Sequence, residues 1–103
     1  MNLKYLYRGN NLLISLCGEI DEFSSRTLRG ELDRLIDDTK PLKSVTIDLK
    51  AVSFVDSTGL GLIIGRYKKL RAQGAELTLS NVPANIDKVF KTSGVYNIAP
   101  KID

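Results

Sequence analysis

Segments with the hydrophobic spacing of strands and of helices alternate along this chain, and that alternation limits the folds open to it. Residues 45–49 place Val, Ile and Leu at every second position, as a strand with one buried face does. The flanking segments, residues 25–38 and 56–74, carry apolar residues three and four positions apart, as helices do. A strand-helix-strand crossover lays its two strands parallel, with the helix against the sheet. The pattern therefore predicts an α/β domain.

Two further predicted strands form a hairpin ahead of this alternation. Residues 3–7 and 12–17 are strand-like, and the Arg-Gly-Asn-Asn sequence between them is typical of a tight turn. A short strand at residues 76–79 and a helix between Pro83 and Gly94 follow the second helix, and a brief segment at residues 95–98 comes last. We expect one domain over residues 1–103, with a mixed sheet opened by the hairpin and helices packed against it.

Residues of helix-capping type set the expected helix boundaries. Ser24 and Ser25 supply hydroxyls that can cap the first helix, and Pro41 prevents its continuation. Gly74 stands where a helix end favours glycine. The apolar face of the second helix is predicted to hold Leu60, Ile63, Ile64, Tyr67 and Leu70, and that of the third Ile86, Val89 and Phe90.

The composition excludes several classes of function. The absence of His and the presence of a single Cys remove the usual ligands of zinc and redox metals and the base of a Ser-His-Asp hydrolase. That cysteine, Cys17, falls in an apolar run, so we expect a buried thiol in a reducing compartment. The net charge of +3 includes no long run of like charges, which argues against a nucleic-acid-binding tail. No segment is long and apolar enough to cross a membrane, and we expect a cytoplasmic protein.

The segment Phe-Val-Asp-Ser-Thr-Gly-Leu-Gly-Leu at residues 54–62 is the most informative for function. It carries two hydroxyls into the start of the second helix, where Ser57 would face unpaired N–H groups and the positive end of the helix dipole. Such a position tolerates or binds a phosphate. Asp56, Ser57 and Thr58 are also ordinary capping residues, and a purely structural cap is the alternative. One cap needs only one such side chain, and here three precede a glycine.

Gly61 and Gly65 lie inside the predicted second helix, where each costs up to about 1 kcal/mol relative to Ala. Either another element of the domain packs closely there, or another protein approaches that smooth face. Asp21 follows the second strand and is expected to cap the helix that begins nearby; its part in a site depends on whether that strand ends beside Ser57. The cations near the end of the second helix are expected to form a solvated face, and these are Arg66, Lys68, Lys69 and Arg71.

At these residues the chain resembles the STAS family, the anti-sigma-factor antagonists of bacterial regulation. Gly-Glu-Ile-Asp at residues 18–21 is similar to the GE(I/L)D motif of the family, and Asp-Ser-Thr-Gly-Leu-Gly at residues 56–61 to its DS(S/T)GLG motif. The resemblance runs over nearly the full length. Relatives usually continue into a final helix, which we expect to be absent here.

The resemblance implies a switch without catalysis, cofactor or metal. It implies that an ATP-dependent anti-sigma-factor serine kinase phosphorylates Ser57, that the unphosphorylated form binds the anti-sigma factor and frees sigma, and that a PP2C-type phosphatase restores it. It also places Asp21, Asp56 and Thr58 around the phosphate. A partner surface is expected at Gly59, Leu60, Gly61, Ile64 and Gly65. Nucleic acid and direct membrane insertion form no part of this interpretation.

Two other classes of function remain open at this point. One is a STAS subunit of an ABC-type transport complex that works without phosphorylation, which would co-purify with a membrane complex. The other is a small nucleotidase or hydrolase, against which the lack of His and of a phosphate-binding loop argues. Glu22 and Phe23 stand where sporulation-type members commonly have two histidines, whereas residues 65–68 look sporulation-like, so the sequence names neither sporulation nor stress response.

Overall fold

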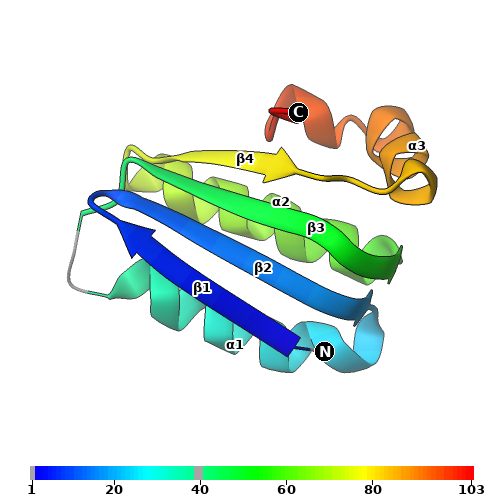
Figure 1. The fold of residues 1–103 in the computed structure, drawn as a ribbon, viewed down its shortest axis with the longest axis horizontal. Coiled ribbons are helices and arrows are strands. Elements are labelled where there is room, and N and C mark those ends of the chain that lie inside the picture. Colours follow the sequence, from blue (N-terminus) through cyan, green and yellow to red (C-terminus); the bar gives the residue numbers. More distant parts are fainter. Residues whose placement is uncertain (1, 39–40) are drawn as a thin grey trace.

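Four strands form one mixed sheet in the order β1-β2-β3-β4 (Figure 1). The computed structural model describes residues 2–38 and 41–103. The strands are β1 (Asn2–Arg8), β2 (Asn11–Ile20), β3 (Ser44–Val55) and β4 (Glu76–Ser80). β1 runs antiparallel to β2, while β2, β3 and β4 are parallel to one another. The expected α/β class and the opening hairpin are confirmed.

Two long helices cover one face of this sheet (Figure 1). The helices are α1 (Glu22–Asp37), α2 (Ser57–Ala72) and α3 (Ala84–Ser93), with a 3-10 turn η1 at Val95–Asn97. The side chains of Leu12, Ile14 and Leu16 are buried on the face that meets the helices, and those of Ile47 and Leu49 continue that layer. Alternation along a strand puts the intervening residues on the other face, where Thr46 and Thr78 share a hydrogen bond of 2.8 Å.

Cys17 lies on that other face and is exposed, so the expectation of a buried thiol is wrong. The apolar run around it suggested burial, but Leu12, Ile14 and Leu16 already occupy the inward positions of β2. Because side chains alternate with a period of two, the next position points to solvent.

α1 begins three residues earlier than expected, and a carboxylate caps it. Asp21 is the N-cap: its side chain accepts hydrogen bonds from the backbone N–H groups of Phe23 and Ser24, at 3.0 and 2.9 Å. The Ser24 hydroxyl accepts in turn from the Asp21 N–H at 3.0 Å, which completes a capping box. Ser25 is buried inside the helix. The two serines therefore belong to the first turn of the helix.

Two cations of α2 join it to α1 instead of forming a solvated face. Arg66 is buried, and its Nε lies 3.2 Å from Oδ1 of Asp33 on α1. The Nζ of Lys69 lies 2.8 Å from Oδ2 of Asp37, one helical turn further along. Lys68 and Arg71 are exposed as expected. In the third helix, Ile86 and Phe90 are buried, but Val89 remains 38% exposed.

The end of the chain covers the outer edge of β4. The backbone N–H of Leu79 donates to the Pro100 carbonyl, and Ile102 N–H donates to the Leu79 carbonyl, at 2.9 and 3.0 Å. The Asp103 carboxylate accepts from the Asn81 N–H at 2.9 Å. Strand-like pairing of this segment was absent from the sequence-based expectation.

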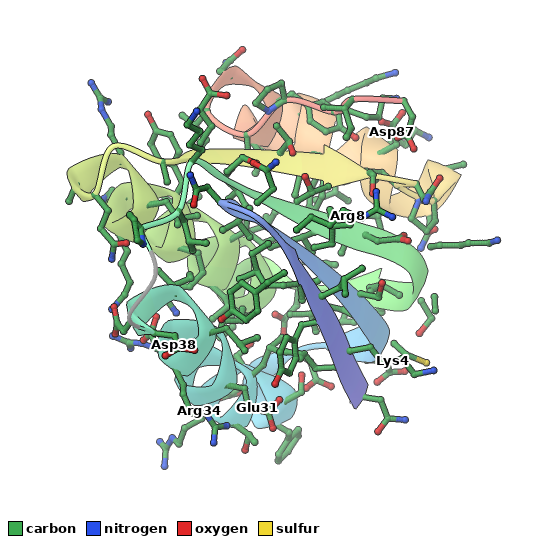
Figure 2. All side chains as sticks on the ribbon, turned by 60° about the vertical axis from the view of Figure 1, so that its left-hand side comes forward. Lys4, Arg8, Glu31, Arg34, Asp38 and Asp87 are labelled. Atoms are coloured by element: carbon green, nitrogen blue, oxygen red, sulfur yellow. The ribbon has the colours of Figure 1, made fainter. Side chains whose placement is uncertain are left out.

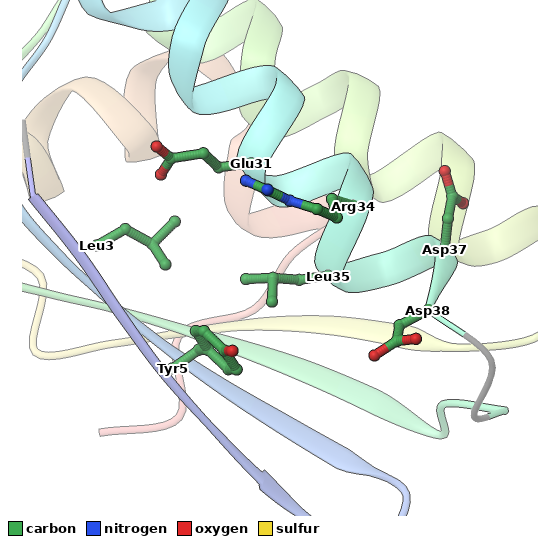
Figure 3. Close-up of a pocket in the computed structure, with 7 residues that line it drawn as sticks. All are labelled: Leu3, Tyr5, Glu31, Arg34, Leu35, Asp37 and Asp38. Atoms are coloured by element: carbon green, nitrogen blue, oxygen red, sulfur yellow. The ribbon is translucent and has the colours of Figure 1, made fainter.

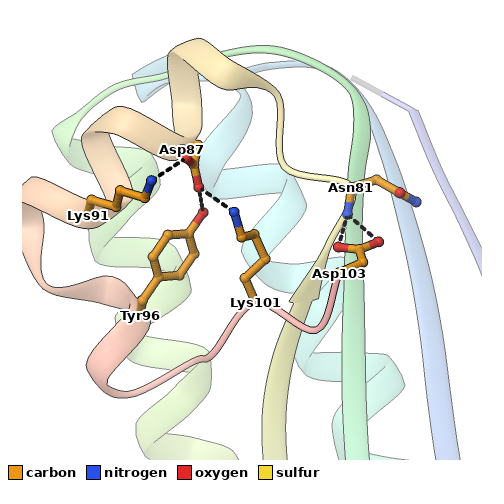
Figure 4. Close-up of polar contacts among 6 residues, drawn as sticks. All are labelled: Asn81, Asp87, Lys91, Tyr96, Lys101 and Asp103. Atoms are coloured by element: carbon orange, nitrogen blue, oxygen red, sulfur yellow. Dashed lines mark hydrogen bonds and ion pairs between the residues drawn. The ribbon is translucent and has the colours of Figure 1, made fainter.

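A cluster of polar side chains around Asp87 of α3 holds the last residues of the chain against α3 (Figure 4). The Asp87 carboxylate accepts from the Tyr96 hydroxyl at 2.5 Å and from Lys101 at 3.1 Å, and it forms an ion pair with Lys91. These donors hold the pKa of Asp87 well below its usual range, with the Tyr96 hydroxyl as the largest cause.

None of the helices described here combines the length and apolarity that a bilayer crossing requires.

Candidate functional site

The two long helices begin side by side at the carboxyl edge of the parallel strands. Ile20 and Val55 are partners in the register of β2 and β3, and each is the last residue of its strand. The Asp56 N–H donates to the Ile20 carbonyl at 3.2 Å, which extends the pairing into the following turn. β2 therefore ends beside the segment that leads to Ser57. Asp21, the residue after β2, thus lies at the same edge of the sheet as Ser57, as a part for Asp21 in the site requires.

Ser57 is the first residue of α2, and its side chain is exposed. Asp56 precedes it as the N-cap and accepts a hydrogen bond of 2.9 Å from the Gly59 N–H. This carboxylate satisfies one of the donors that a helix leaves unpaired at its start. Asp56 thus has the capping role that was the structural alternative, while the hydroxyls of Ser57 and Thr58 are on exposed residues beyond the cap.

Gly59 is buried against the end of β2, and this contact requires glycine. A Cβ at this position would lie 2.6 Å from the Ile20 carbonyl oxygen and 2.8 Å from Cγ1 of Val55. Both distances are shorter than side-chain carbons in folded proteins show. Gly59 therefore lets the first turn of α2 lie directly against Ile20, and its predicted place on the partner surface stays a prediction.

Gly61 and Gly65 have the opposite surroundings. Apart from the chain neighbours and the backbone of α2 itself, no atom of the described residues lies within 4 Å of a Cβ built at either position. Close packing inside the domain, one of the two explanations for these glycines, is therefore wrong. Leu60 and Ile64 beside them are half-buried, so this side of α2 combines apolar side chains with open backbone.

Asp21 lies at the same edge of the sheet, where it starts α1. Its pKa lies below its ordinary value chiefly because the Ser24 N–H donates to the carboxylate, and the Phe23 N–H adds to this effect. Ser24 also donates its hydroxyl to the Glu19 carbonyl at 2.7 Å. The carboxylate is therefore held ionised and fixed by its role as a cap.

Thr58 faces α1 across a shallow groove of about 300 Å³. Arg26 and Arg29 of α1 line this groove, together with the buried Ser25 and Leu62. The sequence did not predict these arginines near Ser57 and Thr58. Their position depends on how α1 packs against α2, and no local pattern of residues reveals that packing. Two exposed aromatic residues were also missed at this end of the molecule: Phe23 is 91% exposed and Phe54 is 48% exposed.

Comparison with known proteins identifies this arrangement. The family model described as the STAS domain matches residues 3–103. The chain belongs to the STAS domain family. The expected family is thereby confirmed. Its two motifs lead into the starts of α1 and α2 in this chain. No cluster of three metal-ligating side chains occurs within residues 2–38 and 41–103.

Several STAS relatives are similar over most of the chain. The anti-sigma-B factor antagonist of Bacillus subtilis is 34% identical over 98 residues, which cover 95% of this chain and 87% of that protein. The anti-sigma F factor antagonist of Paenibacillus polymyxa is 33% identical over 92 residues, 89% of this chain and 78% of that one. The structure of the Bacillus cell fate determinant SpoIIAA in its phosphorylated form has a TM-score of 0.75 at 24% identity, with 99% of this chain and 92% of that chain covered.

Proposed function

We propose that this STAS protein is an anti-sigma-factor antagonist switched by phosphorylation of Ser57. The observation that carries the proposal is the exposed Ser57 hydroxyl at the first residue of α2, in a turn that Asp56 and Gly59 fix against β2. The names of the Bacillus and Paenibacillus relatives support the antagonist function. The phosphorylated form named for SpoIIAA supports a switch of this kind.

The helix start accommodates a phosphate without a change in the core. Backbone N–H groups and the helix dipole favour an anion at the first turn. The phosphate adds about two negative charges, which oppose a docked apolar surface through the cost of desolvation and through repulsion of partner carboxylates. The unphosphorylated form is therefore the one that binds the anti-sigma factor.

The partner surface in this proposal lies along α2 beside Ser57. Gly61 and Gly65 leave the backbone of α2 accessible. Contacts with a partner chain that packs closely there would offset the helix stability that the two glycines cost. Leu60 and Ile64 supply apolar contact.

The implied partners are an anti-sigma factor with ATP-dependent serine kinase activity and a PP2C-type phosphatase. The protein itself is a regulatory binding protein and performs no catalysis in this scheme. Asp56 and Asp21, which lie at the same edge of the sheet, set the charge around the phosphate. We place the switch in the cytoplasm, where the sigma factor acts.

Phosphorylation by the cognate kinase tests the proposal. The kinase that co-purifies with this protein from its native cells is incubated with ATP and the wild-type, Ser57→Ala and Thr58→Ala proteins, and site-mapping mass spectrometry follows the label. We expect Ser57→Ala to abolish labelling and Thr58→Ala to retain most of it. Labelling that follows Thr58, or a membrane transport complex in place of a soluble ATP-binding partner, would contradict the proposal.

A further inference from the structure

A groove runs along the side of α1 that faces the edge strand β1. Its wider part encloses about 720 Å³ between α1 and β1, where Leu3 and Tyr5 point toward Leu35 (Figure 3). Its second part, about 550 Å³, continues along the same side of α1 past Thr27 to the N-terminal cap. Glu31 lines both parts. The residues of α1 in the groove recur three and four positions apart, so they form one stripe of the helix.

Carboxylates dominate this groove although the chain as a whole is cationic. Among the described residues, one cation, Arg34, and five acidic residues line its two parts, and the acidic residues are Glu19, Asp21, Glu31, Asp37 and Asp38. Three of these already interact within the protein, since Asp21 caps α1, Asp37 binds Lys69 and Asp38 makes a further polar or electrostatic contact. Glu19 and Glu31 add further negative charge to the groove, on a protein with a net charge of +3. Such a groove attracts cationic side chains.

The groove borders a strand edge that is open for pairing. β1 pairs only with β2, and no other strand or bridge lies along β1 in residues 2–38 and 41–103. Tyr5 and Leu6 at its centre are 56% and 52% exposed. An edge strand of this kind presents a row of backbone donors and acceptors to any extended segment beside it.

The two faces of β1 carry different charges. The Tyr7 hydroxyl donates to the Leu35 carbonyl at 2.8 Å, so residues 3, 5 and 7 face α1. Lys4 and Arg8 therefore lie on the opposite face, as Figure 2 shows. A strand added to β1 would meet carboxylates on the α1 side and cations on the other side. Its favourable side chains are basic or apolar at positions that face α1, and acidic or polar at the alternate positions.

We propose that this groove binds an extended segment of a partner protein that adds a strand to β1 and directs alternate Lys or Arg side chains at α1. The lengths agree: the 16 residues of α1 span about 24 Å, and an extended segment of about seven residues spans the same distance. The site is separate from the α2 surface of the proposed function.

A second copy of this chain fits the groove less well than a basic segment. In an antiparallel pair of β1 strands, directly opposed residues share a face, so residues 3, 5 and 7 of the copy would face the α1 side. The cations Lys4 and Arg8 of the copy would meet Lys4 and Arg8 of the first chain on the other face. The copy would therefore bring no cation to the carboxylates of the groove.

Binding of a designed peptide tests the proposal. The probe is a fluorescein-labelled peptide of about nine residues, with Lys and Val alternating at odd positions and Glu and Thr at even positions, and its scrambled isomer is the control. We expect the alternating peptide to bind the full chain in anisotropy titrations, more weakly at high salt, and the isomer not to bind. N-methylation of one alternate set of its amides should abolish binding, while N-methylation of the other set should leave it intact.

Two charge reversals of equal size separate a specific site from general attraction. Glu31→Lys, in the groove, should weaken binding about tenfold or more, and Glu76→Lys, an exposed residue on the opposite edge strand, should change it less than about twofold. Equal losses for the two variants, or equal effects of the two N-methylated sets, would overturn the proposal. A dimer in sedimentation equilibrium that Glu31→Lys leaves intact and that excludes the peptide would overturn it in favour of a second copy.

Discussion

Gly59 and Gly61 stand two positions apart in α2 and meet different surroundings. A Cβ at Gly59 would lie 2.6 Å from the Ile20 carbonyl oxygen, whereas one at Gly61 would have no described atom outside the local backbone of α2 within 4 Å. The first glycine therefore serves the fold, and the second remains accessible to a partner. The DSTGLG sequence alone presents the two as equivalent.

Alanine substitutions should separate these roles. Gly59→Ala forces apart the contact with β2 and should lower the free energy of unfolding by about 1–3 kcal/mol. Gly61→Ala removes a glycine from a helix interior without a clash, so it should raise that free energy by up to about 1 kcal/mol. Urea denaturation measures both. A Gly59→Ala protein as stable as the wild type would show that the contact with Ile20 adapts at no cost.

At the level of single residues, the sequence predicts the position of Ser57 better than the neighbours of that residue. The DSTGLG motif and the helix spacing after it are local signals, and they place the hydroxyl at the start of a helix. Arg26 and Arg29 reach the same region from α1, which depends on how two helices pack. Cys17 is exposed because its position in β2 falls on the solvent face of the strand. A continuous apolar run does not reveal which of its residues point to that face.

At the level of elements, Arg66 joins α1 to α2 through charge more than through well-aligned hydrogen bonds. Its Nε is 3.2 Å from Oδ1 of Asp33, but the angle is not that of a hydrogen bond, and its buried Nη1 has no hydrogen-bond partner in the described part of the chain. Burial lowers the pKa of this guanidinium, and the Asp33 carboxylate opposes that shift. A buried cation of this kind is strongly dependent on the carboxylate that it contacts.

Removal of that carboxylate should therefore cost more than removal of the cation. Asp33→Ala leaves Arg66 buried without the carboxylate that it contacts and should lower the free energy of unfolding by about 1–3 kcal/mol. Arg66→Met keeps an apolar side chain of similar length between the helices and should change stability by less than about 1 kcal/mol. Thermal denaturation of both variants tests this order.

The control is a more exposed ion pair between the two helices. Asp37 is 53% exposed where it pairs with Lys69, and its replacement by Ala should change stability by no more than about 0.5 kcal/mol. If Asp37→Ala were as harmful as Asp33→Ala, burial of Arg66 would not be the reason for the loss.

Elements formed by residues that are close in the sequence could be predicted, and elements that depend on contacts between distant residues could not. The spacing of Leu28, Leu32 and Ile36 predicts α1, and these three residues are buried as expected. The start of α1 was placed too late because two serines resemble a cap, whereas Asp21 takes that position and Ser24 completes the capping box. The segment beside β4 has no strand-like alternation of its own, and its pairing comes from the contacts of Asp87 and Asp103.

At the level of the whole molecule, Asp87 makes the attachment of the last residues sensitive to acid. Its pKa in the folded protein is depressed, so its contribution to stability is complete above the unfolded pKa of about 3.9 and is lost as the pH falls toward the folded value. Wild-type thermal stability should therefore fall more steeply below about pH 4 than that of Asp87→Asn. Parallel curves for the two proteins would show that the cluster with Tyr96 and Lys101 does not stabilise the fold.

Phosphorylation should leave the rest of the molecule unchanged. Ser57 is exposed at a helix start, and the phosphate meets backbone N–H groups without displacement of the buried layer. Amide NMR spectra of the two forms should differ mainly over residues 56–66 and the adjoining loops. Widespread shifts through α1 and β3 would show a global conformational change and contradict a switch by local charge.

The parallel pairing also bears on the order in which the chain assembles. Asn11 pairs with Ser44, and Ser44 pairs with Glu76, so the two crossovers close loops of 33 and 32 residues. Closing loops of equal length costs about the same entropy, near 3 kcal/mol each. The strands gain unequal amounts in return, because nine register pairs join β2 to β3 and only five join β3 to β4. β4 and the segment beside it should therefore dock last and open first, with amide hydrogens at Leu77 and Leu79 that exchange sooner than those at Ile14 and Ile47.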